Sequence, residues 1–382
     1  MHAAIDCRYV RERPSGIGAY VRELIDRVPA LAPSDSFRLW AHPLAPRPLS
    51  AAANVDETLV AAPANGLSTL LRPARLAVLD GVDVLHAPFN ILGRGLRLPT
   101  VVTVHDLMWL VAPWAAEGWS LATPFKAAFY TAGIRRALER ASRLVAISNA
   151  TADDIVRRLP EAGPRVRLIP HGVSTRYSPG SGRDPARERV AKRFGFDAPY
   201  FLVVGQNTPS KNHLDVLYAF ARARLGSGTR LVVLHRLYAR RRERGASTME
   251  HAARLGVASR TTRLLQAADD EVVDLLRGAL ALVQFSRFEG FGLPALEAMA
   301  CGTPVIASDI PALVEVLGGA GLHVPLDVTE LARALEHVAR DGVLRAELAA
   351  RGIERSRAFS WQRSAELHLE VYREAAALGW TA

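Results

Sequence analysis

The sequence predicts an α/β protein built from two Rossmann-like domains, and three observations lead to this prediction. The chain has 382 residues, more than a single hydrophobic core usually serves. Apolar runs rich in β-branched residues alternate with helix-spaced patterns along its length, and this alternation indicates βαβ units with parallel sheets. One stretch rich in serine, proline and glycine, residues 178–182, interrupts the alternation near the middle and indicates a boundary.

The first half contains four runs that we predict as strands, at residues 82–86, 100–105, 143–147 and 166–169. Residues 125–141 carry apolar side chains at helical spacing and predict a helix between the second and third of these strands. Ser148 and Thr151 are both suitable N-caps for a helix that follows the third strand. Asp153 and Asp154 suit the first turn of that helix, where the helix dipole favours negative charge.

The second half repeats the same alternation after the boundary. We predict strands at 200–205, 230–234, 280–285 and 304–308, and helices at 211–224, 270–278, 294–300 and 360–377. The charged run 183–193 separates the two halves. We therefore expect a first domain at 1–177, a linker at 178–198, a second domain at 199–358 and a C-terminal helix within 359–382.

Composition narrows the classes of protein that fit. The hydrophobic fraction of 49% and the charged fraction of 23% are those of a globular protein. No apolar run approaches the roughly 18–20 residues that span a bilayer, and the N-terminal residues lack the apolar core of a signal peptide. The two cysteines, Cys7 and Cys301, suit a reducing compartment. We therefore expect a cytoplasmic protein.

The net charge of +10 is carried almost entirely by arginine, since lysine occurs only at 126, 192 and 211. This charge permits contact with phosphates or with an anionic membrane at its inner face. The densest cluster, Arg236 to Arg244, lacks interleaved stacking aromatics beyond one tyrosine. It is more typical of a solvated face than of a nucleic-acid site, so we expect no nucleic-acid partner.

Residues 289–302 form the most informative stretch of the chain. Pro294 suits the first turn of a helix and Gly302 suits the position just after its end, which predicts a short helix at 294–300. This helix follows the glycine-containing loop 289–293. Free N–H groups and partial positive charge at the helix start, together with close backbone approach at the glycines, predict a seat for a phosphate.

Two carboxylates flank this phosphate seat, Glu289 in the loop and Glu297 in the helix. A carboxylate does not favour a phosphate, but it readily accepts hydrogen bonds from sugar hydroxyls. A ligand with phosphate between two polyhydroxylated parts matches this arrangement, and a nucleotide-sugar is such a ligand. The structural alternative is a tight βα turn whose two glutamates are simply solvated.

The same stretch closely resembles the signature of retaining glycosyltransferases of the GT-B fold, glycosyltransferase family 4. The match begins with the spacing of Glu289 and Glu297 and continues through S-R-F-E-G-F-G-L-P-A-L-E-A-M-A-C-G-T-P-V-I-A-S. Further segments along nearly the whole chain are similar to motifs of this family: Ile5-Asp6 with Ser15-Gly16-Ile17-Gly18, Thr103-Val104-His105-Asp106, Ala146-Ile147-Ser148, Ile169-Pro170-His171-Gly172-Val173, Gly205 to Lys211-Asn212, and Phe359-Ser360-Trp361.

The resemblance implies roles for ten residues. In the catalytic group, Glu289 would bind hydroxyls of the transferred sugar, His105 would contact the same sugar, and Lys211 would neutralise the diphosphate leaving group. In the donor-binding group, Glu297 would hold the ribose. The backbone amides of Phe291, Gly292 and Leu293 would bind the β-phosphate and the sugar, and the glycine positions near the donor phosphates would be Gly16, Gly18 and Gly205.

We therefore predict two Rossmann-like domains facing each other across a cleft, with a C-terminal helix that crosses back to the first domain. The enzyme would move a hexose from a GDP- or UDP-hexose to a hydroxyl of a glycan, lipid-linked or small-molecule acceptor, with retention and without a metal or other cofactor. Mannose is favoured by a resemblance of the first domain to O-antigen and capsule mannosyltransferases. The alternatives are a sugar-nucleotide epimerase or trehalose-phosphate-type synthase of the same fold, and a non-catalytic basic surface-binding module.

Three positions depart from the family pattern. Ser210 stands where the family often has an arginine before the lysine, so one phosphate-binding charge is missing and either another residue replaces it or turnover is weaker. His171 replaces the usual asparagine. The run that ends at His235 lacks the glycine that commonly follows this strand.

The chain also contains a segment that is close to a dinucleotide-binding motif. The segment Gly16-Ile17-Gly18 is close to a dinucleotide fingerprint, but the glycines lie well after the strand and the last position is valine, so we expect no NAD site. As an alternative, it is a plain turn at a helix start. No cluster with the spacing of metal ligands is present in the sequence. The tryptophans at 109, 114 and 119 could line an acceptor site or touch a membrane, although ordinary packing explains them equally well.

Overall fold

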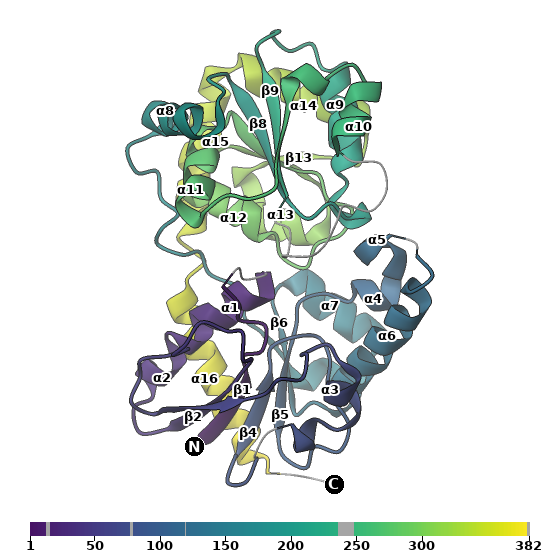
Figure 1. Cartoon of the computed structure of the whole chain (residues 1–382), viewed down its shortest axis with the longest axis vertical. Helices are drawn as coiled ribbons and strands as arrows, with labels where there is room; N and C mark the ends of the chain where they lie inside the picture. Colours follow the sequence, from purple (N-terminus) through teal and green to yellow (C-terminus); the bar gives the residue numbers. More distant parts are fainter. Residues whose placement is uncertain (13–15, 77–78, 119, 236–247, 380–382) are drawn as a thin grey trace. The chain divides into compact units, whose positions relative to one another are not determined.

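The computed structural model describes residues 1–12, 16–76, 79–118, 120–235 and 248–379. The chain divides into two compact units (Figure 1). The C-terminal helix, drawn in yellow, belongs to the first of them. The first unit comprises Met1–Trp114, Trp119–Gly172 and Ser360–Ala382, and the second comprises Ala115–Gly118 and Val173–Phe359.

The first unit is built on a seven-stranded sheet in which every pair of neighbouring strands is parallel. The strand order is β3-β2-β1-β4-β5-β6-β7. The strands are β1 (His2–Asp6), β2 (Ser36–Ala41), β3 (Val55–Leu59), β4 (Val84–Ala87), β5 (Thr100–Val104), β6 (Arg143–Ala146) and β7 (Val166–Leu168). The four strands predicted in this half are therefore confirmed.

The helices of this unit are α1 (Gly16–Ile25), α2 (Val28–Leu31), α3 (Leu67–Leu71), α4 (Met108–Val111), α6 (Thr123–Arg140) and α7 (Asn149–Arg158), with short 3₁₀ turns η1 (Pro73–Arg75) and η2 (Pro160–Arg165). Helix α5 (Pro113–Glu117) has its first two residues in this unit and the others in the second. The predicted helix 125–141 corresponds to α6. Ser148 is the N-cap of α7 and accepts a hydrogen bond from the Thr151 amide, so the first of the two N-cap candidates is the correct one.

The second unit contains a six-stranded parallel sheet with the order β10-β9-β8-β11-β12-β13. Its strands are β8 (Tyr200–Gly205), β9 (Arg230–His235), β10 (Thr261–Leu264), β11 (Ala281–Gln284), β12 (Val305–Ser308) and β13 (Leu322–Val324). The central strands β8, β9 and β11 are fully apolar along most of their length, as expected for a sheet covered on both faces.

The helices of this unit are α8 (Arg183–Phe194), α9 (His213–Arg222), α10 (Thr248–Arg254), α11 (Asp269–Gly278), α12 (Leu293–Ala300), α13 (Pro311–Leu317), α14 (Val328–Arg340) and α15 (Gly342–Ser356), with 3₁₀ turns η3 (Pro209–Lys211), η4 (Ala258–Arg260) and η5 (Gly318–Ala320). The charged run within the predicted linker 178–198 forms helix α8, which packs against α11. The predicted helix 211–224 begins only at His213, because Asn212 adopts a left-handed conformation with φ of 57°.

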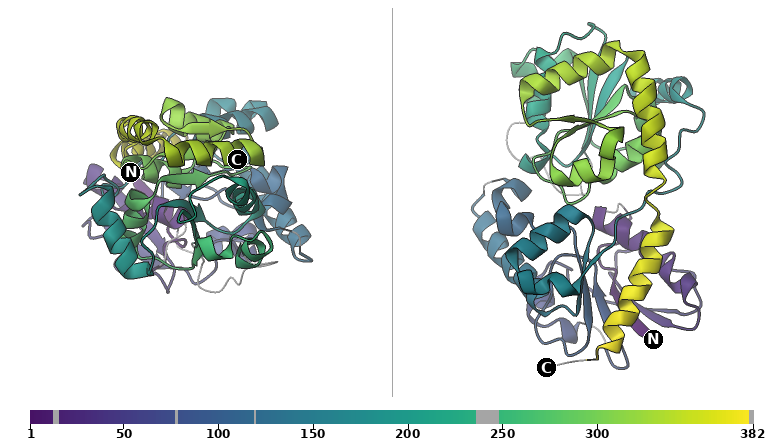
Figure 2. Two further views of the ribbon diagram at one scale, coloured as in Figure 1. Left: turned by 90° about the horizontal axis from the view of Figure 1, so that it is seen from above. Right: turned by 180° about the vertical axis from the view of Figure 1, so that it is seen from behind.

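The last helix, α16 (Trp361–Ala377), follows the second unit in sequence but belongs to the first (Figure 2). It packs against α1, α2 and the strands β4 and β5. Gly172 permits this return, because a Cβ atom at this position would lie 2.0 Å from the Trp361 amide nitrogen. The predicted C-terminal helix and its return to the first domain are confirmed.

Each sheet has one position where the strand order reverses. In the first sheet the order reverses at β1, whose neighbours are β2 and β4. In the second sheet it reverses at β8, whose neighbours are β9 and β11. Loops at the carboxyl ends of strands on either side of such a switch diverge, and the crevice they leave is the usual ligand site of open α/β sheets. Among the described residues, no helix is long and apolar enough to cross a membrane.

Candidate functional site

The switch point of the second sheet brings together the loops that follow β8 and β11. Its centre is the carboxylate of Glu289. Oε1 accepts hydrogen bonds from Lys211 Nζ at 2.6 Å, Gln284 Nε2 at 2.9 Å and Ser286 Oγ at 2.7 Å, and Oε2 accepts a second bond from Lys211 Nζ at 2.8 Å. Lys211 and Glu289, which lie 78 residues apart in the sequence, therefore form one ion pair.

The surrounding backbone fixes this ion pair in place. The Arg287 amide donates to the Ser210 carbonyl at 2.7 Å, which ties the loop after β11 to the loop after β8. Ser308 Oγ donates to the Ser286 carbonyl at 2.5 Å, so the end of β12 supports the same loop. The Glu289 side chain is only 9% exposed and that of Lys211 is 25% exposed. A partly shielded pair attracts more strongly than a pair in open water.

The loop 289–293 leads directly into α12, whose first residue is Leu293 rather than the predicted Pro294. Gly292 adopts φ of 111°, which favours glycine, and a Cβ there would lie 2.5 Å from Leu313 Cδ2. The Phe291 side chain is buried edge-on against Phe359, with ring centroids 5.7 Å apart. Side-chain packing thus anchors the loop while the backbone N–H groups at the helix start remain suited to an anion.

The remaining predicted donor residues lie near these loops or in the other unit. Glu297 lies one turn into α12, with an intermediate exposure. Gly205 is the last residue of β8, directly before the loop that carries Lys211. Gly16 and Gly18 both lie in the first turn of α1. Ser15, which belongs to the same motif, lies outside the described residues.

His105 follows β5 in the first unit, and its hydrogen bonds determine its chemistry. Nε2 lies 2.9 Å from the Pro88 carbonyl oxygen, which can only accept, so Nε2 carries the proton. Burial lowers the pKa of His105 to about 4, so the ring is neutral at pH 7. Nδ1 then holds a lone pair that can accept a hydrogen bond from a sugar hydroxyl. The His105 amide donates to Asn90 Oδ1 at 2.6 Å, which fixes the backbone at this position.

A chain of hydrogen bonds lies behind His105 and connects α16 to the sheet. Tyr372 Oη contacts His86 Nδ1 at 2.7 Å, and His86 Nε2 contacts Thr103 Oγ1 at 2.8 Å. Tyr20 Oη contacts Thr103 Oγ1 at 2.8 Å and His368 Nε2 at 2.7 Å. The Tyr20 ring also packs edge-on against the His105 ring, with centroids 5.2 Å apart.

The direction of every bond in this chain follows from its last member. His368 Nδ1 lies 2.7 Å from the Ser364 carbonyl and must donate to it, so Nε2 of the neutral ring accepts from the Tyr20 hydroxyl. Tyr20 then accepts from Thr103, Thr103 accepts from His86 Nε2–H, and His86 Nδ1 accepts from Tyr372. Burial lowers the pKa values of both histidines, to about 4 for His368, and keeps them neutral.

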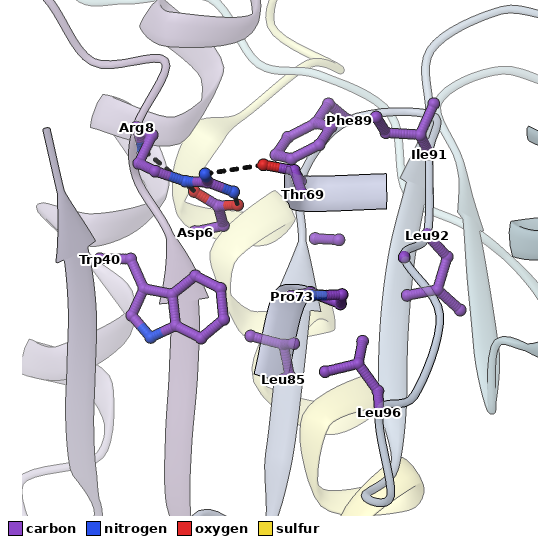
Figure 3. A pocket seen from close by; sticks show the side chains of 12 residues that line it. Asp6, Arg8, Trp40, Thr69, Pro73, Leu85, Phe89, Ile91, Leu92 and Leu96 are labelled. Atoms are coloured by element: carbon purple, nitrogen blue, oxygen red, sulfur yellow. Dashed lines mark hydrogen bonds and ion pairs between the residues drawn. The ribbon is translucent and has the colours of Figure 1, made fainter. Parts of the chain in front are cut away.

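Figure 3 shows a small cavity in the first unit. Its volume is about 20 Å³, which is room for a single water molecule and excludes a sugar. Arg8 and Asp6 line it as a buried pair joined by two hydrogen bonds, from Nε at 2.8 Å and from Nη2 at 2.5 Å, and Arg8 Nη1 also donates to Thr69 Oγ1 at 2.9 Å. Asp6 therefore has a structural role.

Several residues of the site carried no sequence signal that we used. Gln284 and Ser286 both donate to Glu289. Gln284 ends the apolar run of the predicted strand 280–285, so the pattern indicates only a strand residue there. A buried polar residue at the carboxyl end of a parallel strand is the signal that could have identified it. Within the described ranges, no group of three or more histidine, cysteine, aspartate or glutamate residues is arranged to hold a metal ion.

Two of the three tryptophans named in the sequence analysis lie within the described residues. Trp109 stacks on Tyr130 with centroids 4.5 Å apart, so it has a packing role, whereas Trp114 is 47% exposed. Trp119 and the whole arginine cluster, from Arg236 to Arg244, lie outside the described residues.

Comparison with protein families and known proteins adds to this geometry. Residues 14–177 match the family model described as Glycosyltransferase Family 4, and residues 186–357 match that described as Glycosyl transferases group 1. The MMP alpha-(1->4)-mannosyltransferase of Mycolicibacterium hassiacum is 30% identical, over 95% of this chain and 88% of that protein. The alpha-maltose-1-phosphate synthase of Mycolicibacterium smegmatis is 30% identical, over 97% of this chain and 98% of that protein.

Solved structures show the same fold at lower identity. Sucrose-phosphate synthase from Thermosynechococcus elongatus superposes with a TM-score of 0.75 and 22% identity, over 99% of this chain and 100% of that chain. Anabaena HepE in complex with UDP-glucose superposes with a TM-score of 0.68 and 16% identity, over 98% and 100% of the two chains. With its two parallel sheets and its returning α16, this chain has the GT-B fold and belongs to the group 1 glycosyltransferases of glycosyltransferase family 4.

Proposed function

We propose that this glycosyltransferase moves a hexose from a nucleotide diphosphate sugar to a hydroxyl acceptor with retention of the anomeric configuration. The observation that carries the proposal is the Lys211–Glu289 ion pair at the switch point of the second sheet. A cation that would serve a diphosphate and a carboxylate that would serve sugar hydroxyls lie side by side, and the carboxylate stands four residues before a helix whose start suits phosphate; this supports the proposal.

Each group has a defined task in this proposal. Lys211 and the amides at the start of α12 stabilise the charge that develops on the leaving diphosphate, which lowers the barrier more than it strengthens substrate binding. Glu289 positions the transferred sugar through its hydroxyls. The Nδ1 lone pair of His105 accepts from another hydroxyl of that sugar. In this retaining mechanism, the acceptor hydroxyl attacks the same face and passes its proton to the leaving phosphate.

The relatives guide the choice of substrates to test. One relative is a mannosyltransferase by name, which favours mannose, and a structural neighbour was solved with UDP-glucose. GDP-mannose and UDP-glucose are therefore the first donors to test. We propose that diphosphate stabilisation by Lys211 and backbone amides needs no metal or other cofactor. A glycan, a lipid-linked sugar or a small molecule would serve as acceptor. The epimerase, the trehalose-phosphate-type synthase and the non-catalytic module gain no support from these relatives.

The test replaces Glu289 by glutamine, which keeps the size of the side chain and removes its charge. Release of UDP from UDP-glucose and of GDP from GDP-mannose would be measured with and without a panel of sugar acceptors. We expect Glu289→Gln to lower turnover about 100-fold or more, as loss of one positioned group in an active site commonly does. The exposed Glu354→Gln change is the matched control and should retain full turnover. Wild-type turnover in Glu289→Gln would refute the proposal.

A further inference from the structure

The diphosphate that the site is proposed to bind carries more charge than Lys211 alone can offset. Ser210 stands where the family often has an arginine. It is 3% exposed, and its hydroxyl is hydrogen-bonded to Thr208 Oγ1 at 2.9 Å. The neighbouring Arg287 guanidinium is held by Asp215, with Nη2 2.6 Å from Oδ2. Neither position offers an unengaged side chain to stand beside Lys211 and the amides at the start of α12, so a further side-chain donor would come from elsewhere at this edge of the sheet.

His213 has the position and the unmet hydrogen-bonding capacity for this task. It is the first residue of α9, two residues after Lys211, and it is 4% exposed. Among the described residues, no side chain or backbone group is hydrogen-bonded to its ring, and Nδ1 is fully buried without a partner. Leaving a buried polar ring without partners is costly, so the arrangement is maintained against a free-energy penalty.

The ring faces a small space that glycine leaves at the end of β8. A Cβ atom built on Gly205 would lie 3.8 Å from His213 Nε2 and 3.7 Å from Lys211 Cδ. The imidazole nitrogen and the lysine side chain therefore border the same space, at the carboxyl end of the switch-point strand. Gly205 itself has φ of 156°, a backbone conformation that side chains rarely adopt.

His235 supports the ring from the far side. The two imidazoles stack with centroids 5.5 Å apart and planes inclined by 15°. His235 is the last residue of β9, the strand after which the expected glycine is missing, and its Nε2 lies 3.3 Å from Thr248 Oγ1. One departure from the family pattern, at His235, thus contacts His213, and another, at Ser210, lies three residues before it in the sequence.

We propose that His213 binds the diphosphate of the nucleotide-sugar donor, with Nε2–H donating to a phosphate oxygen beside Lys211. This inference rests on the proposed function, since it assigns a further ligand within the same donor site. Burial, with Lys211 and His235 nearby, lowers the pKa of His213 to about 3, so the ring approaches the phosphate as a neutral donor. Because the ring has no described partner to give up, the phosphate contact replaces nothing.

The test compares the binding of nucleoside diphosphates and monophosphates by titration calorimetry. UDP with UMP and GDP with GMP are the probes, because within each pair only the second phosphate differs. We expect His213→Leu to weaken binding of the diphosphate about 10- to 30-fold while leaving the monophosphate within about 2-fold. His213→Gln keeps a neutral N–H donor near the position of Nε2 and should stay within about 3-fold of wild type. The exposed His337→Leu in α14 is the control.

The outcomes separate this inference from the proposed function. If wild-type protein binds neither diphosphate, both ideas fail together. If Lys211→Met abolishes diphosphate binding while His213→Leu binds like wild type, only the role of His213 is wrong. Equal losses for monophosphate and diphosphate in both His213 variants would likewise overturn it, because they would place the ring against the nucleoside or in the packing of α9.

Discussion

The Glu289 carboxylate receives four hydrogen bonds from three side chains, and this saturation has a mechanistic consequence. Gln284 and Ser286 hold the carboxylate on one side, so Lys211 is the partner that a donor can displace. In the proposed reaction, a phosphate of the donor binds Lys211 in place of Glu289. A sugar hydroxyl then donates to the Glu289 oxygen that Lys211 has released. Under the proposed function, this internal ion pair would preorganise the site, and its two residues would each contact a different part of the ligand.

Lys211 can be tested directly. Lys211→Met keeps the length of the side chain but removes the cation, and we expect kcat/KM to fall about 100- to 1,000-fold because the leaving diphosphate loses its charged partner. Lys192→Met, on the exposed surface of α8, is the matched control. The measurement is nucleotide release from GDP-mannose and UDP-glucose. A loss below about 3-fold would show that Lys211 only pairs with Glu289.

At the residue scale, the sequence identified the groups that carry motifs and missed those that support them. Glu289 and Lys211 were both predicted, and the structure brings them together. Their pairing could not be predicted, because it depends on the neighbouring positions of β8 and β11 in the sheet. Gln284 and His213 lie in strand and helix patterns that look ordinary in one dimension. Only the folded chain shows that Gln284 donates to Glu289 and that the His213 ring has no hydrogen-bond partner within the described ranges.

At the scale of elements, α16 is joined to the sheet by a chain of buried hydrogen bonds in which each group has one role. Tyr372 starts this chain by donating to His86 Nδ1. A buried acceptor that loses its donor costs about 1–3 kcal/mol. The chain therefore specifies the seating of α16 more precisely than apolar packing alone does.

Removing one hydroxyl from this chain should measure its contribution. Tyr372→Phe leaves the ring in place and His86 Nδ1 without a donor, and we expect the free energy of unfolding of the first unit to fall by about 1–3 kcal/mol. Urea unfolding followed by tryptophan fluorescence would detect this. Tyr218→Phe, on a tyrosine 41% exposed in α9, should change nothing. An unchanged midpoint for Tyr372→Phe would mean that water or another donor replaces the hydroxyl.

Several elements were not predicted from the sequence, and two of them, β3 and α8, have weak patterns. β3 reads Val-Asp-Glu-Thr-Leu, and its polar residues hide a strand at the edge of the first sheet. Helix α8 is so highly charged that we predicted a linker, although Ala186 and Val190 bury its inner face. The strands β5, β8 and β11 were predicted because they are buried on both faces and therefore have continuous apolar runs.

At the scale of the whole molecule, the alternation of strands and helices correctly predicted two α/β sheets, whereas the return of α16 came only from the family resemblance. Periodicity describes a helix but not the unit it joins. The contact that accommodates the return, Gly172 against the Trp361 backbone, joins positions far apart in sequence. In the sequence, the only local sign of this long-range contact is the isolated glycine at position 172.

The two units should also respond differently to acid. The first unit buries four histidines whose pKa values are lowered by desolvation: His86, His105, His171 and His368. In the unfolded chain their pKa is about 6.5. Between pH 6.5 and about 4 the unfolded chain therefore binds more protons than the folded one, so stability is full above pH 6.5 and is lost as the pH falls. Each such histidine contributes about 1.4 kcal/mol per pH unit within this window.

Tryptophan fluorescence isolates this effect, because the sequence of the second unit, residues 115–118 and 173–359, contains no tryptophan. We expect the urea midpoint seen by fluorescence to fall steeply from pH 7 to pH 5. In the first unit, the carboxylates with lowered pKa values are Asp35 and Glu374. They titrate below this pH range and should add little to the fall in the urea midpoint. Far-UV circular dichroism, which reports on both units, should then show two transitions at pH 5, the first of them matching the fluorescence. A fluorescence midpoint that is constant between pH 7 and pH 5 would mean that these histidines take up protons without leaving their buried positions, and the hydrogen-bond directions assigned to His86 and His368 would be wrong.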